Sequence, residues 1–470
     1  MKPYFPHSPL KLFGFLVVAI FFLIASFVLI NLAKGYRFEL RGLKVNLTKT
    51  GMIIFSSRPA DANVTFDGKI VKKKSGGSFF PSKITGLLDG EYTLRLEKSG
   101  YIPWEKRLRV DNEFVTWVDY IILFPEKAKR EFLIEDGKII TAKSSPDLKK
   151  IAYIYENKDK QKELWYFDSL NLSKTNLFSN KEDKKNIEIS DLTWSTDSSK
   201  ILFKQKKDDK TDLIVVNIRD ITSPVNISST FKMDFENLIW SPTDSNELFW
   251  IKETSLYKIN LNNKTLSASL IDKAVSVGST DDKYLYLIRD VNGERSLWRM
   301  DTSGNNPEKI VKSLPNSKSY TVKYSTASGD LLIIIDGEVK TVYLAENIGG
   351  QLELLELSKN ASDAFWSPNG KKILYRNEKN IWTYDIEKEK EYEAIKDADV
   401  RSAMWYIDSY HIAANLGGEY KVLEFDGWNS VSLGVSKIGD IFFSPEFKYF
   451  FYAGDFEDKK DNLVIYNLRS

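Results

Sequence analysis

The chain has no cysteine and only two histidines, His7 and His411, among its 470 residues. Without cysteine it has no disulfides, zinc–thiolate sites, iron–sulfur clusters or thiol catalysis. Two histidines are too few for a multi-histidine metal site. Lysine and arginine number 67 against 65 aspartates and glutamates, so the charge is nearly balanced. No positive field points to nucleic acid, and we expect no nucleic-acid partner.

Motifs of hydrolytic chemistry are missing as well. The hydrolase domains that accompany propellers in some peptidases need a G-x-S-x-G elbow and a histidine base, and the sequence contains no such elbow. His411 falls in a predicted strand, where packing or hydrogen bonding is the usual role of a histidine. The acidic pairs Asp208-Asp209 and Asp281-Asp282 lack a full calcium loop, and we interpret them as solvated turns. We therefore predict no catalytic, cofactor-binding or metal-binding residues. The sequence does not exclude a pair of carboxylates that cleaves a glycosidic bond, because such a pair needs only to be close in space.

A long uncharged run lies near the N-terminus. Residues 12–33 carry no charge, and as a helix they would span roughly 33 Å, close to the hydrocarbon thickness of a bilayer, about 30 Å. A cleaved signal peptide is the alternative, but its apolar region is shorter and Asn31-Leu32-Ala33-Lys34 is a poor cleavage site. We predict that residues 12–33 are a single-pass signal anchor in the lipid bilayer. It would follow a short cytoplasmic tail, residues 1–11, and precede an extended basic linker, residues 34–50.

Residues 51–125 contain repeated strand signals separated by turns. In Tyr92–Leu96, the residues Tyr92, Leu94 and Leu96 would face one way while Thr93 and Arg95 face the other, as in a half-buried strand. Asp67-Gly68 and Asp89-Gly90 are turn pairs. The other predicted strands are Met52–Phe55, Val64–Phe66 and Arg107–Val110.

Three segments of this region resemble the PEGA domain: Pro59–Gly68, Leu88–Leu94 and Lys98–Tyr101. Asp61 stands where that family usually has glycine. The resemblance implies a small β-sandwich of a kind common on bacterial surface proteins, with no catalytic residues to carry over. Lys72-Lys73-Lys74 would lie in a loop of this domain, either solvated or in contact with an anionic envelope polymer.

After residue 125 one sequence motif recurs, and it is clearest in Trp366–Tyr375. The motif consists of a strand end, a Ser-Pro-Asn-Gly turn and an apolar strand. The step between copies is roughly 43 residues, typical of four-stranded propeller blades. Most first strands after the turn are apolar on both faces, as expected of sheets stacked between neighbours. The eight copies begin at Ser145, Trp194, Trp240, Ser279, Ser325, Trp366, Trp405 and Phe443.

These units resemble the blades of TolB-type and WD-repeat propellers. We predict a β-propeller over residues 131–470, with eight blades favoured and seven possible because some copies depart from the motif. The final copy supplies only three strand signals, so we predict that Glu131–Ile134 completes it and closes the ring. We interpret Trp194, Trp240, Trp366 and Trp405 as core anchors at blade junctions. The expected fold class is all-β with one N-terminal transmembrane helix.

The membrane orientation is ambiguous from charge alone. Lys2 and Lys11 precede the apolar run, whereas five basic residues follow it before residue 50, which favours a cytoplasmic body. The short tail and the family resemblance favour the opposite: a single-pass protein of the cytoplasmic membrane with both β domains on the extracytoplasmic side.

Our leading interpretation is a non-catalytic, membrane-anchored cell-envelope protein whose propeller binds a protein or cell-wall partner. The PEGA-like module would then be a spacer or wall contact. Two alternatives stay open: a hydrolase or lyase acting on envelope glycan or peptide through carboxylates in the propeller funnel, and a structural component of a surface layer or assembly.

Overall fold

A computed structural model describes most of the chain. The described residues are 9–33, 36–41, 44–132, 137–179, 187–278, 284–325, 327, 331–348, 351–358, 360–435, 441–443, 449–456 and 459–467. Some positions of the sequence motifs lie outside the described residues. They are Leu133 and Ile134 of the predicted closing strand, residues 279–282, and parts of the repeated turns that begin at Ser325 and Phe443. The chain divides into two compact units, Met1–Lys127 and Ala128–Ser470.

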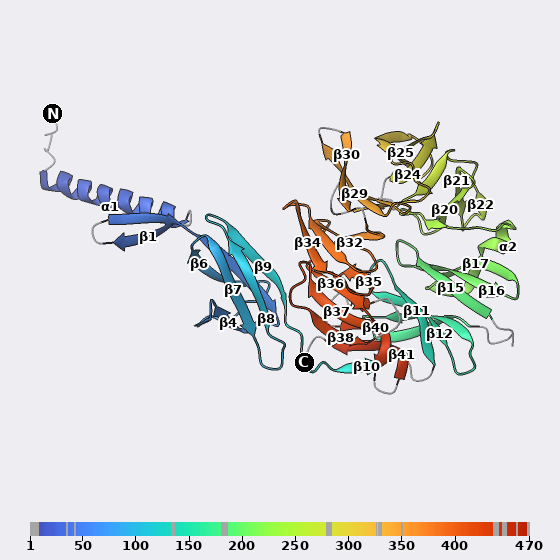
Figure 1. Cartoon of the computed structure of the whole chain (residues 1–470), viewed down its shortest axis with the longest axis horizontal. Coiled ribbons are helices and arrows are strands. Elements are labelled where there is room, and N and C mark those ends of the chain that lie inside the picture. The colour runs from blue at the N-terminus through green and yellow to red at the C-terminus, as the bar shows by residue number, and fades with distance from the viewer. Residues whose placement is uncertain are drawn as a thin grey trace, which may run out of the picture. The chain divides into compact units, whose positions relative to one another are not determined.

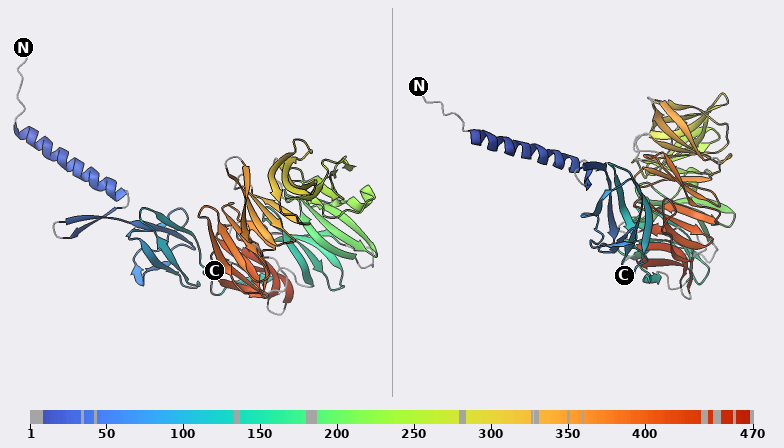
Figure 2. Two further views of the ribbon diagram at one scale, coloured as in Figure 1. Left: turned by 45° about the horizontal axis from the view of Figure 1, so that its top comes forward. Right: turned by 60° about the vertical axis from the view of Figure 1, so that its left-hand side comes forward.

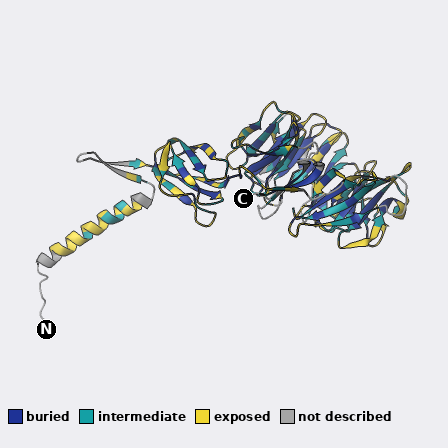
Figure 3. Cartoon of the chain, turned by 90° about the horizontal axis from the view of Figure 1, so that it is seen from below, coloured by how far each residue is buried: buried dark blue, intermediate teal, exposed yellow. Residues whose placement is uncertain are grey.

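The first unit begins with helix α1, Pro9–Ala33 (Figure 1). Within the described residues, Phe13–Ile30 is the one helical stretch with the length and mean hydropathy, 3.0, to cross a bilayer. None of this stretch is buried, as the exposed colours in Figure 3 show. An apolar surface of this kind is costly in water, which fits the predicted membrane segment.

A two-stranded hairpin follows the helix, within residues 34–50, the segment predicted to be an extended basic linker. Strands β1, Tyr36–Arg41, and β2, Lys44–Lys49, pair antiparallel along their whole length. Each strand is extended, as expected, but the pairing between them was not predicted.

A β-sandwich completes the first unit, as predicted. One sheet has the order β6 (Ser82–Leu87), β3 (Gly51–Arg58), β9 (Val115–Ile122), and the other β5 (Lys69–Val71), β4 (Asn63–Phe66), β7 (Gly90–Glu97), β8 (Trp104–Val110). Leu94 and Leu96 are fully buried in the core between the sheets, whereas Arg95 faces outward. The predicted alternation of this strand is therefore confirmed. Asp61 has φ of 64°, a left-handed conformation that explains why glycine suits this position.

The second unit is a β-propeller with eight four-stranded sheets in the described part of the chain (Figures 1 and 2). Blade 1 has β11 (Lys138–Ser144), β12 (Lys150–Glu156), β13 (Lys162–Asp168) and β14 (Ser173–Phe178). Blade 2 has β15 (Ile187–Trp194), β16 (Lys200–Lys207), β17 (Lys210–Asn217) and β18 (Asp220–Asn226), followed by the short helix α2 (Ile227–Phe231). Blade 3 has β19 (Ile239–Trp240), β20 (Glu247–Lys252), β21 (Ser255–Asn260) and β22 (Thr265–Leu266).

The later blades repeat the pattern. Blade 4 has β23 (Ala274–Val277), β24 (Tyr284–Val291), β25 (Glu294–Asp301) and β26 (Glu308–Leu314). Blade 5 has β27 (Tyr320–Tyr324), β28 (Leu332–Asp336), β29 (Thr341–Ile348) and β30 (Gln351–Ser358). Blade 6 has β31 (Asp363–Trp366), β32 (Lys372–Arg376), β33 (Ile381–Asp385) and β34 (Lys390–Ile395). Blade 7 has β35 (Val400–Trp405), β36 (His411–Leu416), β37 (Glu419–Glu424) and β38 (Val431–Val435).

Blade 8 joins the two ends of the propeller. It has the order β10 (Arg130–Phe132), β41 (Lys459–Asn467), β40 (Tyr449–Phe456), β39 (Ile441–Phe443). Glu131 pairs with Ile465 and Phe132 with Val464, and Figure 1 shows β10 in cyan beside β41 in red. The predicted closing strand is thus confirmed over its described residues.

Packing between successive blades runs around the whole ring. Shared apolar cores join blades 1 to 6 in order and also join blade 8 to blade 1, where Phe167 and Phe451 meet edge to face at 5.3 Å. Thr383 Oγ1 of blade 6 donates to the Phe425 carbonyl of blade 7 at 2.8 Å. The ring centroids of Tyr420 in blade 7 and Tyr452 in blade 8 lie 5.2 Å apart. Because every blade covers its neighbours, strands in mid-blade are buried on both faces.

Candidate functional site: the propeller channel

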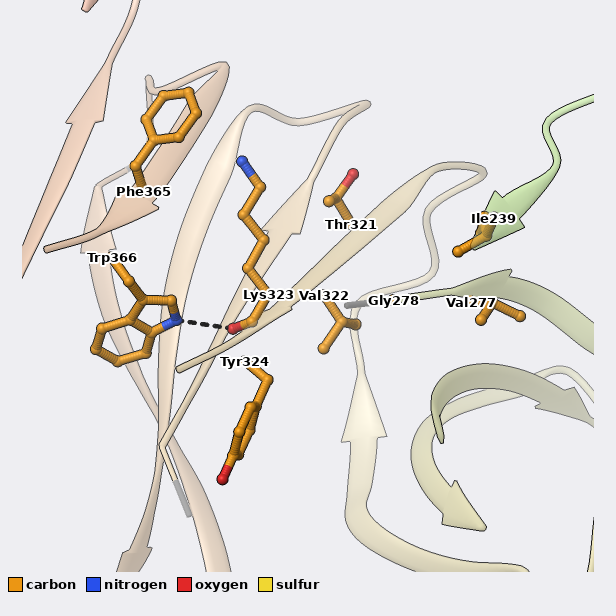
Figure 4. Close-up of a pocket in the computed structure, with 9 residues that line it drawn as sticks. All are labelled: Ile239, Val277, Gly278, Thr321, Val322, Lys323, Tyr324, Phe365 and Trp366. Carbon is orange, nitrogen blue, oxygen red and sulfur yellow. Dashed lines mark hydrogen bonds between the residues drawn. The ribbon is translucent and has the colours of Figure 1, made fainter. Parts of the chain in front are cut away.

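Two pockets are lined mainly by the first strands of the blades. One, of about 420 Å³, is lined from blades 3 to 6 (Figure 4). The other, of about 370 Å³, is lined from blades 1, 6, 7 and 8. The first pocket has Ile239, Val277, Gly278, Thr321, Val322, Lys323, Tyr324, Phe365 and Trp366; the second has Lys143, Ser144, Asp363, Phe365, Arg376, Ser402, Ala403, Met404, Ala413 and Phe442.

Lys323 in the first pocket is held by three neighbouring groups. Its ammonium donates to Asp363 Oδ1 and to the Ala364 carbonyl, both at 2.7 Å. It also lies 4.2 Å from the centroid of the Phe365 ring, within the range of a cation–π contact. Asp363 and Phe365 line the second pocket, so this ion pair forms the wall between the two.

Arg376 places a guanidinium group among the residues that line the second pocket. Its Nε atom is buried and makes no hydrogen bond within the described residues. Asp363, the acidic residue that lines this pocket, is already paired with Lys323. The two pockets thus combine aromatic rings, a neutralised ion pair and a guanidinium, a set suited to holding polar or anionic groups of a ligand. We refer to Lys323, Asp363, Phe365 and Arg376 as the channel cluster.

No motif or spacing in the sequence indicates the channel cluster. Phe365 immediately precedes the predicted anchor Trp366, and Asp363 lies two residues before Phe365 in β31. Lys323 lies in β27, a blade earlier, and Arg376 in β32. Only the circular stacking of the blades brings these positions together.

The four tryptophans of the repeat lie at blade junctions, as predicted. Trp194, Trp240 and Trp405 are buried. Three of the four indoles donate Nε1–H to a carbonyl in the first strand of the preceding blade: Trp194 to Lys143 at 3.0 Å, Trp366 to Lys323 at 2.9 Å and Trp405 to Phe365 at 3.1 Å. Trp366 also lines the first pocket, so it serves both roles. Trp240 Nε1 is buried without an acceptor among the described residues.

The hydrogen bonds of the serine in the repeated turn explain why this residue recurs. Ser195 Oγ donates to Asp197 Oδ1 at 2.7 Å and accepts from the Lys200 N–H at 2.9 Å. Ser145 and Ser367 make the same pair of contacts in blades 1 and 6. Each of these serines therefore holds its turn closed, which is a structural role.

His411 is buried and bound to Asp408, its Nδ1 lying 2.6 Å from Oδ2. The same carboxylate accepts from the backbone N–H groups of Tyr410 and His411 at 2.9 Å. Burial raises the pKa of Asp408, but His411 and these hydrogen bonds outweigh it, so the pKa lies below its ordinary value. The pair closes the turn between β35 and β36 and lies among the residues of neither pocket.

Two further expectations concern acidic groups. Asp208-Asp209 lies in the turn between β16 and β17, as interpreted, whereas Asp281-Asp282 lies outside the described residues. Throughout the part of the chain that the structure describes, His, Asp and Glu form no group of three suited to a metal ion. The facing carboxyl pair that would favour the hydrolase alternative is not found among the described lining residues of the two pockets.

Comparison with known proteins agrees with this fold. The PEGA domain family matches residues 50–122, and no curated protein matches the chain. Similar solved structures include TolB from Acinetobacter baumannii (14% identity, 65% of this chain and 80% of that chain, TM-score 0.31). Others are the WD40 repeats of RRP9 (10%, 60% and 97%, 0.40) and an oligogalacturonate lyase from Vibrio parahaemolyticus (13%, 71% and 98%, 0.41). Such identities concern the fold alone. The chain thus joins an N-terminal apolar helix, a PEGA domain and a β-propeller.

Proposed function

We propose that this chain is a non-catalytic cell-envelope protein, anchored in the cytoplasmic membrane by α1, whose propeller binds a protein or envelope-polymer partner on the extracytoplasmic side. The PEGA domain acts as a spacer or wall contact. The exposed apolar helix supports the anchor, because a water-soluble protein would cover such a surface.

The chemistry of the channel cluster is the observation that carries the binding role. Lys323 and Asp363 neutralise each other, Phe365 offers a flat apolar surface, and Arg376 adds a cationic guanidinium to the second pocket. Recognition needs such fixed, convergent groups. Acid–base catalysis by carboxylates would instead need a second acidic group in the same pocket.

The test is recovery of a partner from detergent-solubilised membranes by the full-length chain and two channel variants, Phe365→Ala and Arg376→Ala. Matched controls are Phe79→Ala and Arg219→Ala, which change exposed residues outside the channel. We expect channel variants to lose about tenfold or more in affinity, equivalent to about 1.4 kcal/mol. The controls should bind as the unchanged chain does. Equal recovery by all five proteins would refute a channel-borne partner.

The enzyme alternative has its own outcome in a second assay. Purified full-length protein is incubated with envelope glycan and with peptide, and cleavage products are measured. Products that disappear with Asp363→Asn would replace the proposed function with a hydrolase or lyase. We expect no cleavage.

A further inference from the structure

One segment of the PEGA domain combines lysines with exposed apolar side chains. It runs from β5 into the start of β6, over residues 69–83, and has five lysines and no acidic residue. Lys72–Lys74 are all exposed. Ile70, Phe79 and Phe80 are 85%, 93% and 85% exposed. Large apolar side chains gathered on a surface in this way mark a contact with a partner. We refer to residues 69–83 as the basic–aromatic segment.

Hydrogen bonds hold the backbone of this segment in place. The Ser75 N–H donates to the Ala62 carbonyl at 2.9 Å. Ser82 Oγ donates to the Lys74 carbonyl at 2.7 Å, which joins the two ends of the loop that carries the phenylalanines. The lysines and rings therefore project from a fixed backbone, and little ordering of the chain is needed when a partner binds.

Gly76 allows the loop to fold back on itself. A Cβ atom at this position would overlap the Phe80 carbonyl oxygen and would lie 2.8 Å from the Ser82 nitrogen. A larger residue could fit only if the loop moved. The positions of the two phenylalanines thus depend on this glycine.

The basic–aromatic segment lies far along β3 from the point where the chain enters the sandwich. The chain arrives from α1 and the hairpin at Gly51, and at the other end of β3 the Ser57 N–H donates to the Gly76 carbonyl at 3.0 Å. Gly51 and Ser57 are separated by about 20 Å of extended strand. The chain also leaves the sandwich at this second end, where the Leu123 N–H donates to the Arg58 carbonyl at 2.8 Å. This placement favours a partner beyond the membrane surface over lipid headgroups.

The charges of the segment indicate an anionic partner. Lysine ammonium groups bind phosphate and carboxylate groups as point charges. One exposed carboxylate, Asp61, lies beside the segment, since its N–H donates to the Ser75 carbonyl at 3.0 Å. Arg58, which donates to Ser78 Oγ at 3.4 Å, offsets that charge. The surface is therefore positive overall.

The phenylalanines indicate a partner that also has apolar faces. Phe79 and Phe80 present flat rings without a polar group. The C–H faces of sugar rings can pack against such rings, while anionic groups of the same chain meet the lysines. An anionic glycan carries both kinds of group in one molecule.

We propose that the basic–aromatic segment binds an anionic polysaccharide of the cell envelope. The lysines contact its phosphate or carboxylate groups, and Phe79 and Phe80 pack against its sugar rings. The proposal gives a site and a ligand class to the wall contact of the proposed function, and it rests on that function for the extracytoplasmic location of the domain. The segment belongs to the first unit and the channel cluster to the second, so the two sites can be tested separately.

The charges are tested with the full-length chain in phosphatidylcholine nanodiscs. Its affinity is measured for glucosylated poly(glycerol phosphate), for hyaluronate and for neutral dextran. Changing Lys72→Gln, Lys73→Gln and Lys74→Gln together should lower the affinity for a charged polymer about tenfold or more, and added salt should weaken binding by the unchanged chain. Dextran should not bind. The matched control changes three exposed propeller lysines and should bind as the unchanged chain does: Lys160→Gln, Lys264→Gln and Lys273→Gln.

The rings are tested with the same polymers. Phe80→Ala should lower the affinity about threefold or more, because it removes an apolar face without changing the charge. Phe114→Ala is the matched control, since Phe114 is 70% exposed and its carbonyl accepts from the Met52 N–H near the start of β3. It should bind as the unchanged chain does.

Three results would overturn the inference. They are no binding of either charged polymer, equal affinity of the unchanged chain and the lysine or ring variants, and binding of phosphatidylglycerol vesicles in place of the polymers, which would make a bilayer the partner. The channel assay gives an independent outcome. Phe79→Ala should lose affinity for the polymer and keep the partner of the channel, whereas Arg376→Ala should do the reverse. Failure of the channel prediction alone would leave this inference standing.

Discussion

The sandwich and the propeller bury their strands in two different ways. Along β8 of the sandwich, alternate residues from Trp104 to Val110 are buried and exposed. Along β28 of the propeller, all five residues from Leu332 to Asp336 are buried. A sandwich strand therefore needs one covering sheet, which its own domain supplies, whereas a blade needs a neighbour on each side. The sandwich should be stable by itself, and the propeller should depend on its closed ring.

Substitutions that create a cavity in one core or the other should show most clearly that the sandwich and the propeller unfold separately. Phe451→Ala removes a fully buried ring between blades 8 and 1, and Leu94→Ala empties part of the sandwich core. Each should cost about 2–5 kcal/mol, lowering only the calorimetric transition of its own unit. A single transition that shifts with both variants would show that the two units unfold together.

Breaking the closing strand tests the dependence on the ring. Asn467 N–H donates to the Lys129 carbonyl at 3.0 Å, so alternation makes Glu131 and Ile465 the next hydrogen-bonded pair. Glu131→Pro removes that donor and should destabilise the whole propeller by about 3 kcal/mol. Glu131→Ala, which keeps the backbone donor, is the control and should change little. The same melting temperature for both variants would contradict ring closure through β10.

Acid should weaken the propeller through Asp408. Because the folded-state pKa lies below the ordinary value of 3.8, the ionised carboxylate stabilises the fold above that pH. This contribution is lost as the pH falls below about 4. Asp408→Asn should cost about 1.5–3 kcal/mol at neutral pH and flatten the pH dependence of propeller unfolding. Asp234→Asn, an exposed aspartate, is the control. An unchanged slope in Asp408→Asn would contradict the assignment.

The smallest expected change in stability is the difference between substitutions of two tryptophans at blade junctions. Trp366→Phe removes the indole donor that reaches the Lys323 carbonyl and should cost about 1 kcal/mol beyond the lost volume. Trp240→Phe removes a buried donor that has no acceptor among the described residues, so it should cost less. Denaturant unfolding of both variants measures the difference. A larger loss for Trp240→Phe would mean that its indole has a partner after all.

Much of the fold could be predicted because it is encoded locally. The Ser-x-Asp turns at Ser145 and Ser195 and the apolar strand after each recur at a regular step, which identifies the blades. The closing strand followed from counting strands in the last copy. The pairing of Tyr36–Arg41 with Lys44–Lys49 was not predicted. The alternation of apolar and polar residues in these strands is short, and no Asn-Gly or Asp-Gly pair between them indicates a turn.

The channel cluster could not be predicted for a different reason. Lys323 and Asp363 are 40 residues apart, and their ion pair arises from the angle between neighbouring blades. No local pattern encodes that angle. The role of Trp366 was predicted as a core anchor, but its position on the pocket wall depends on the same geometry.

The central claim is that α1 anchors a propeller on the extracytoplasmic side. The most direct measurement labels Val339→Cys in intact cells with a membrane-impermeant maleimide, since this is the only cysteine in the variant and it lies in an exposed turn. We predict full labelling without lysis, with the protein in the membrane fraction. Labelling only after lysis would place the propeller inside the cell and contradict the account.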